Sequence, residues 1–237
     1  HALQKRYERE IGELVTASNR LAVLGYVASH GGNLSARIEE DVVLITPTKV
    51  PKRDIVFEDI CMVTMQGEIL FAGEGRKPTS EVPFHLRIFQ RRPDLRAIVH
   101  AHPPILTGFA ITGDNTLCMP FLPEPAIEVG PMVMVPYALS GSDALADAFE
   151  TVLDDSNGFL MENHGALMTN NEGILRAVDL LEMMEGAAQS ALVAKFLGGF
   201  KPLRDRDVDA LEQGLAARGL PMPGKPGKHA TLRDVFS

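Results

Sequence analysis

Apolar residues recur along this chain with two spacings, and these spacings divide most of it into helices and strands. Near the start, Leu3, Tyr7, Ile11 and Leu14 share one helical face, and we expect that helix to end at Gly25. Short apolar runs bounded by turn residues predict strands over 42–46, 60–64, 68–72, 97–101, 132–135, 158–162 and 165–168. Helical spacing predicts further helices near 80–91, 143–153 and 172–197. The alternation of helices and strands predicts an α/β protein.

The 237 residues contain neither internal repeats nor a low-complexity linker, which predicts one domain over residues 1–237. The segment 201–237 is richer in charged residues, glycine and proline than the rest of the chain. We expect it to form a peripheral C-terminal helix followed by an extended arm, with a neighbouring subunit as one surface that the arm can pack on.

The net charge of −8 argues against a nucleic-acid partner, because phosphate backbones attract an excess of Lys and Arg. No apolar run approaches the roughly 20 residues that span a bilayer, so we expect no membrane association and a cytoplasmic protein. Cys61 and Cys118 lack the CxxC spacing of metal or redox sites and are interpreted as buried thiols.

Two histidines lie at the end of the predicted strand 97–101 and carry the clearest chemical signal. Side chains alternate between the faces of a strand, so His100 and His102 point the same way, roughly 6 to 7 Å apart along the strand. Pro103 and Pro104 end the strand directly afterwards and place the pair beside solvent. Two imidazoles in this arrangement suit one metal ion. Two polar residues at a strand end without a ligand are the alternative.

A third histidine and an acid complete a plausible site. His164 lies beside a glycine in a tight turn between two predicted strands, and a three-histidine set leaves an open position for water or substrate. Glu81 follows Thr79 and Ser80, either of which can cap the N-terminus of the predicted helix. A carboxylate there can complete the coordination of a metal or transfer protons. The alternative is that Glu81 only complements the helix dipole.

Five motifs in order extend this picture over most of the chain. They are Gly32-Asn33-Leu34-Ser35-Ala36-Arg37, Leu44-Ile45-Thr46-Pro47-Thr48, Pro78-Thr79-Ser80-Glu81, His100-Ala101-His102-Pro103-Pro104 and Glu162-Asn163-His164-Gly165-Ala166. Together they resemble the class II aldolase/adducin family over about residues 5 to 200. The resemblance implies a three-layer α/β/α sandwich with a largely antiparallel central sheet. It also implies a homotetramer with active sites at the subunit interfaces.

In the sugar-phosphate aldolases of the family, the Gly-Asn-x-Ser loop, a Thr-Gly pair and two small residues before the glutamate hold the substrate phosphate. The resemblance assigns this anion-binding role here to Asn33, Ser35, Thr48, Thr79 and Ser80. Two positions depart from the pattern. Lys49 replaces the glycine after Thr48, and His30 replaces a small hydroxyl residue. Both changes narrow the pocket and add positive charge, which favours a planar carboxylate over phosphate. A Lys49 side chain turned out to solvent is the alternative.

The family's aldolases also place a tyrosine some twenty residues after the histidine pair. None of Tyr7, Tyr26 and Tyr137 occupies that position. The chain therefore looks most like members that decarboxylate hydroxylated aromatic or pyridine dicarboxylates. The decarboxylase of 3-hydroxy-2-methylpyridine-4,5-dicarboxylate in vitamin B6 degradation is one such member that the chain resembles. A sugar-phosphate aldolase or epimerase, similar to L-fuculose-phosphate aldolase, is the alternative, and an adducin-like binding module is a third.

The predicted chemistry assigns a role to each group. His100, His102 and His164 hold one divalent cation per subunit, with Mn²⁺ favoured and Zn²⁺ as the alternative. Glu81 delivers a proton to the ring carbon that loses carbon dioxide. Lys49, with the hydroxyl residues around it, holds a second carboxylate of the small anionic substrate. His85, one helical turn after Glu81, is predicted to support the site and not to bind the metal.

Overall fold

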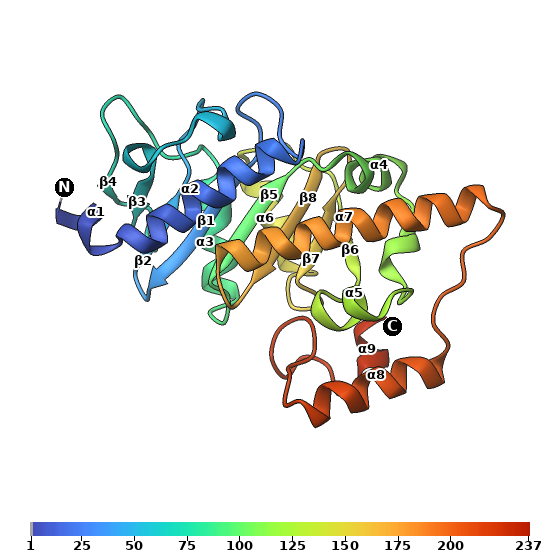
Figure 1. The fold of residues 1–237 in the computed structure, drawn as a ribbon. Helices are drawn as coiled ribbons and strands as arrows, with labels where there is room; N and C mark the ends of the chain where they lie inside the picture. The colour runs from blue at the N-terminus through green and yellow to red at the C-terminus, as the bar shows by residue number, and fades with distance from the viewer. Residues whose placement is uncertain (1) are drawn as a thin grey trace.

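An eight-stranded mixed sheet runs through the computed structural model, which describes residues 2–237 (Figure 1). Its strands are β1 (Asn33–Glu39), β2 (Val42–Ile45), β3 (Cys61–Val63), β4 (Ile69–Phe71), β5 (Ala97–Ala101), β6 (Met132–Val135), β7 (Gly158–Met161) and β8 (Gly165–Asn170). The spatial order is β4-β3-β2-β1-β5-β8-β7-β6. Only β6 and β7 pair in parallel, so the sheet is largely antiparallel, as predicted.

All seven predicted strands are present, and β1 is an eighth, at a motif that was predicted to form a loop. Leu34, Ala36 and Ile38 alternate with polar residues in β1, which is the ordinary signal of a half-buried strand. β1 lies between β2 and β5, and its first residue, Asn33, pairs with His100. The overlooked strand therefore brings the Gly-Asn-x-Ser motif beside the histidine pair.

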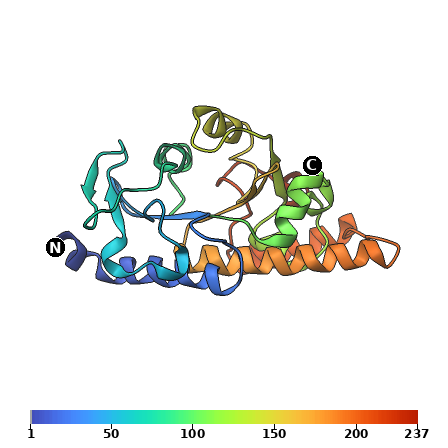
Figure 2. The same ribbon diagram turned by 90° about the horizontal axis from the view of Figure 1, so that it is seen from above.

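Helices cover both faces of the sheet (Figure 2). Helices α2 (Glu8–Val23) and α7 (Ile174–Phe196) lie against one face, and α3 (Val82–Arg91) and α6 (Asp143–Glu150) against the other. Alternate residues of one strand enter different cores. Val99 of β5 belongs to the cluster on the α2 and α7 side, whereas Ile98 belongs to the cluster on the α3 and α6 side.

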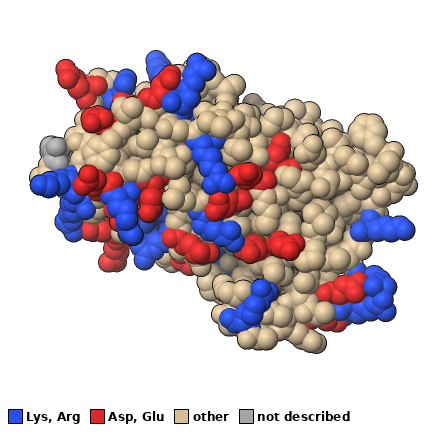
Figure 3. All heavy atoms as spheres, in the orientation of Figure 1, with Lys and Arg blue, Asp and Glu red and all other residues tan. Residues whose placement is uncertain are grey.

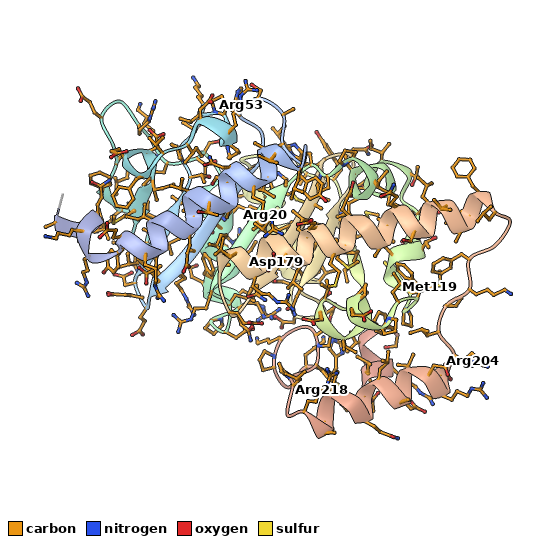
Figure 4. All side chains as sticks on the ribbon, viewed as in Figure 1. Arg20, Arg53, Met119, Asp179, Arg204 and Arg218 are labelled. Carbon is orange, nitrogen blue, oxygen red and sulfur yellow. The ribbon has the colours of Figure 1, made fainter. Side chains whose placement is uncertain are left out.

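A branched ion pair joins the two long helices of one layer. Arg20 of α2 donates to Asp179 of α7 at 2.6 Å and also to Glu182 (Figure 4). All three side chains are partly exposed, so each pair contributes at most about 1 kcal/mol to stability. The apolar residues beneath them provide the main driving force for packing.

The other helices are short or lie at the periphery. They are α1 (Ala2–Arg6), α4 (Pro104–Thr112), α5 (Pro123–Glu128), α8 (Asp205–Ala217), α9 (Leu232–Val235) and the 3₁₀ turns η1 (Lys52–Asp54), η2 (Phe57–Asp59) and η3 (Asn115–Cys118). Across residues 2–237, no helix combines the length and the apolar character that crossing a membrane requires.

The C-terminal segment contains the expected peripheral helix, α8, and an arm that returns to the body of the same chain (Figure 1). The backbone N–H of Lys225 donates to the carbonyl of Asp154, and His229 Nε2 lies 3.0 Å from the carbonyl oxygen of Asp155. Helices α8 and α9 share a small apolar cluster of their own. Contact of the arm with a neighbouring subunit stays a prediction.

Candidate metal and substrate site

Three histidine side chains meet where β5 ends and the β7–β8 turn begins. His100 is the fourth residue of β5, His102 follows the strand directly, and His164 lies in the turn. The Nε2 atom of His100 lies 3.2 Å from Nε2 of His164 and 3.3 Å from Nε2 of His102. The three ligand atoms all lie within 4.8 Å of one another. The structure thus brings together the three predicted metal ligands.

The turn that carries His164 depends on a glycine. The N–H of His164 donates to the carbonyl of Met161, and Asn163 adopts a left-handed conformation with φ of 53°. A Cβ atom on Gly165 would lie 2.5 Å from Cδ2 of His102 and 2.6 Å from the carbonyl oxygen of Ala101. Any side chain at this position would push the turn away from β5 and separate the imidazoles.

The protonation of the rings fits a cation. Nδ1 of His100 lies 3.0 Å from the carbonyl oxygen of Ala166, which only accepts, so Nδ1 carries the proton and Nε2 has a free lone pair. Burial lowers the pKa of His100 to about 3 and also lowers the pKa values of His102 and His164, which keeps the rings neutral at pH 7. Two nitrogens that bind one tetrahedral ion at about 2.05 Å lie roughly 3.3 Å apart, close to the observed separations.

Glu81 lies beside these histidines, and its side chain does not cap the helix. Helix α3 begins at Val82, so Glu81 occupies the N-cap position that was predicted for Thr79 or Ser80, and its side chain makes no capping bond. Its carboxylate instead accepts from Nδ2 of Asn33 at 2.7 Å and from the hydroxyl of Ser140. Burial raises the pKa of Glu81, but the interaction with His100 and the bonds from Ser140 and Asn33 outweigh burial, and the pKa lies below its ordinary value. In this state the carboxylate is ionised and accepts protons.

A chain of hydrogen bonds continues from Asn33 into the core. Oδ1 of Asn33 pairs with Nε2 of His85, and Nδ1 of His85 lies 2.7 Å from the hydroxyl of Ser35. Ser35 and His85 are both fully buried. The prediction that Ser35 binds substrate is therefore wrong, because its hydroxyl faces His85 beneath the pocket. His85 supports the site, as predicted.

One pocket of about 210 Å³ contains the remaining predicted residues. Its lining includes His30, Asn33, Thr48, Lys49, Thr79, Ser80, Glu81, His100, His102 and His164. The loops that carry them are tied together, since Thr79 N–H donates to the carbonyl of Thr46 and Thr48 N–H donates to that of Lys77. Lys49 is exposed at the pocket wall with φ of 60°, a conformation that glycine adopts more readily.

Ser140 lines the same pocket and was not predicted. It lies in the loop between β6 and α6, far in sequence from every other lining residue except His164. The neighbouring Tyr137 N–H donates to Glu162, which holds this loop near the histidine turn. A single serine in a polar loop carries no sequence signal that separates it from ordinary turn chemistry.

Comparison with known proteins agrees with this arrangement. The sequence model of one protein family, the Class II Aldolase and Adducin N-terminal domain, matches residues 12–192. The chain belongs to this family. The 3-oxo-tetronate 4-phosphate decarboxylase of Haemophilus influenzae is 33% identical over 168 residues, which cover 70% of this chain and 78% of that protein. The L-fuculose phosphate aldolase of Methanococcus maripaludis is 36% identical over 164 residues, covering 69% of this chain and 86% of that protein.

The same family fold is found in a solved structure. YgbL from Klebsiella pneumoniae superposes with a TM-score of 0.76 at 31% sequence identity, covering 86% of this chain and 98% of that one. A decarboxylase and an aldolase both cleave carbon–carbon bonds, so a lyase activity of either kind fits this member of the class II aldolase family. Neither of the two relatives is named for a pyridine dicarboxylate, and that substrate receives no support from them.

Proposed function

We propose that this class II aldolase family member is a divalent-metal-dependent carboxy-lyase of a small anionic substrate. The observation that carries the proposal is the convergence of three neutral imidazoles beside the ionised Glu81, inside a pocket lined by backbone loops and Lys49. A divalent cation there would act as a Lewis acid that stabilises negative charge on a substrate oxygen. Glu81 is placed to take up a proton from solvent and to deliver it to the carbon that carbon dioxide leaves.

The substrate class that we favour is a phosphorylated 3-oxo acid. The match with the 3-oxo-tetronate 4-phosphate decarboxylase extends over more than three quarters of the length of that protein. In a 3-oxo acid, the ketone beside the departing carboxylate receives the electron pair that carbon dioxide leaves behind. The loops at Asn33, Thr48 and Thr79 would hold the phosphate, because backbone N–H groups and hydroxyls suit its acceptor oxygens.

A hydroxylated aromatic or pyridine dicarboxylate is the second candidate. Lys49 lines the pocket where an ammonium can pair with a second carboxylate, and His30 adds a further donor beside it. A ring hydroxyl next to the departing carboxylate would take the place of the 3-oxo group.

An aldol cleavage is less favoured by the pocket itself. In the described part of the chain, residues 2–237, no tyrosine lines the pocket that contains the three histidines. The sugar-phosphate aldolases of the family use a tyrosine to protonate the aldehyde oxygen that aldol cleavage releases.

The ligand atoms that the site offers indicate which metal ion it prefers. Mn²⁺ was predicted for a mixed nitrogen and oxygen site, but the cluster within 4.8 Å contains three imidazole nitrogens, and Glu81 is engaged by Asn33 and Ser140. Imidazole suits Zn²⁺, whereas Mn²⁺ prefers oxygen ligands. We therefore favour Zn²⁺, with Mn²⁺ as the second ion to test.

We further propose that the chain assembles as a homotetramer with active sites near subunit interfaces. Large apolar side chains are exposed at the free end of α7, namely those of Val193, Phe196 and Leu197. The surface over this end of the molecule carries few charged side chains (Figure 3). Exposed apolar patches of this kind mark protein contacts.

The function is tested with protein loaded with either metal, supplied in turn with 3-oxo-tetronate 4-phosphate, 3-hydroxy-2-methylpyridine-4,5-dicarboxylate and L-fuculose 1-phosphate. We expect carbon dioxide from the first substrate, loss of activity after chelation, and recovery on adding metal back. Carbon dioxide from the pyridine alone would establish the second candidate. Cleavage of the ketose phosphate without carbon dioxide from either acid would contradict the carboxy-lyase proposal.

A further inference from the structure

Lys52 is a buried cation behind the wall of the metal site. It begins η1, directly after Pro51, and its side chain is only 1% exposed. Its Nζ atom donates to the carbonyl of His30 at 3.3 Å and approaches the carbonyl of Val50 at 3.5 Å. Within residues 2–237, no carboxylate forms an ion pair with this ammonium.

A buried charge without a counter-ion destabilises a fold. Burial lowers the pKa of Lys52 to about 8. At pH 7 the group is still protonated in most molecules, since each pH unit changes the ratio of the two forms tenfold. The chain therefore keeps a positive charge in its interior at a place where methionine would fill the same space.

The loop that Lys52 holds lies between the ammonium and the histidines. The carbonyl group that accepts from Nζ belongs to His30, and the next residue, Gly31, lies near the ring of His102. A Cβ on Gly31 would lie 3.4 Å from two atoms of that ring. The His30-Gly31 segment thus connects the Lys52 ammonium with a candidate metal ligand.

We propose that Lys52 is a specificity-determining residue whose counter-charge is supplied by the anionic group of the bound substrate. The ammonium acts through the His30-Gly31-Gly32 loop, and because the Lys52 side chain is itself buried, water screens its charge only weakly. The same charge opposes the binding of the cation by the histidines. This inference rests on the proposed function only in taking the ligands of the site to be a metal and an anion.

The opposite effects on the two ligands separate this role from a structural one. Without the charge, the metal should bind more tightly and the anion more weakly. A lysine that only supports the loop would, when replaced, loosen the site and weaken both.

The experiment compares Lys52→Met with Arg53→Met. Arg53 is the next residue of the same 3₁₀ turn, but its side chain is exposed and pairs with Asp54 at 3.8 Å (Figure 4). Zn²⁺ affinity is measured by competition with a chromophoric chelator, and the binding of inorganic phosphate to metal-free protein by calorimetry. For a unit charge about 10 Å away at an effective dielectric constant of about 20, each dissociation constant should change about tenfold.

We expect Lys52→Met to lower the dissociation constant for Zn²⁺ and to raise that for phosphate, with Arg53→Met changing neither. If both ligands weaken together, or if either constant stays at the unmodified value, the proposal is overturned. Thermal melting checks that the variant folds, and Lys52→Gln, with the same expected signs, replaces it where Lys52→Met does not fold. Both readouts are binding constants, so a chain that shows this pattern and decarboxylates nothing would contradict the proposed function alone.

Discussion

At the scale of residues, the negative charge of Glu81 determines which atoms of the hydrogen-bonded side chains around it carry protons. An ionised carboxylate only accepts, so Asn33 must turn its NH₂ group toward Glu81 and its carbonyl oxygen toward His85. His85 then donates from Nε2 and accepts from Ser35 at Nδ1. Burial lowers the pKa of His85 to about 4, so the ring is neutral at pH 7, as this order of protons requires.

Two substitutions of His85 test this order. Gln places an N–H near Nε2 and can still donate to Asn33, whereas Asn is one carbon shorter and cannot reach it. We expect His85→Asn to lower kcat about 10- to 100-fold, the usual cost of losing a supporting partner, and His85→Gln to restore most of it. The substrate KM should change little in either variant. Equal kcat values in the two variants, with similar melting temperatures, would show that His85 only fills space.

Glu81 itself is tested by Glu81→Gln, which keeps the size of the side chain and removes its proton exchange. Turnover should fall by roughly 10² to 10⁴. Zinc content, measured by elemental analysis, should be unchanged, because the three imidazoles form the cluster without Glu81. His102→Ala is the matching control, since it should lose the metal. A Glu81→Gln protein without metal would assign the carboxylate to coordination and not to proton transfer.

We expect Lys49 to determine which anion the pocket prefers. Its ammonium can form a charge-assisted hydrogen bond of roughly 1.5 to 3 kcal/mol with a carboxylate. Lys49→Gly should therefore weaken use of an aromatic dicarboxylate about 10- to 100-fold in kcat/KM, and the left-handed backbone at this position is compatible with glycine. An unchanged ratio of activities on dicarboxylate and phosphate substrates would mean that Lys49 faces solvent during the reaction.

At the scale of elements, the β7–β8 turn controls how close the histidines come. Gly165→Ala would place a methyl group 2.5 Å from the His102 ring, so the turn must move away from β5. We expect zinc affinity to fall at least about tenfold, while the strands, paired along their whole length, keep the fold. Gly186→Ala in α7, which meets no atom within 4 Å, is the control and should bind zinc normally. Normal zinc affinity in Gly165→Ala would show that the turn adapts without cost.

Local sequence patterns predicted those helices and strands whose bounds are set by residues close in the sequence. Strands β5 and β6 appear with the predicted bounds, and Pro103-Pro104 does end β5. β1 and α4 were missed, since a strand that opens on a polar motif and a helix that starts at a proline resemble loops. The histidines and Glu81 were found because their motifs are contiguous. Ser35 was misplaced because only the tertiary pairing with His85 turns its hydroxyl inward.

At the scale of the whole molecule, the free end of α7 exposes large apolar side chains that no other part of the described chain, residues 2–237, covers. Phe196 and Leu197 are 84% and 83% exposed. Each exposed side chain of this size gives up about 1.5 to 3 kcal/mol that burial would provide. Contact with other copies of the chain would recover this free energy.

The double variant Phe196→Glu with Leu197→Glu tests whether that contact forms. Light scattering of the unmodified protein should give about four times the 25.8 kDa mass of one chain, and the variant should give smaller species, because charged side chains resist burial. Arg218→Glu, on the exposed end of α8, should leave the mass unchanged (Figure 4). The turnover of the smaller species then tests whether the active sites lie at subunit interfaces. A monomer with normal kcat has complete active sites of its own, whereas a folded, zinc-loaded monomer without turnover lacks a group that only its neighbour supplies.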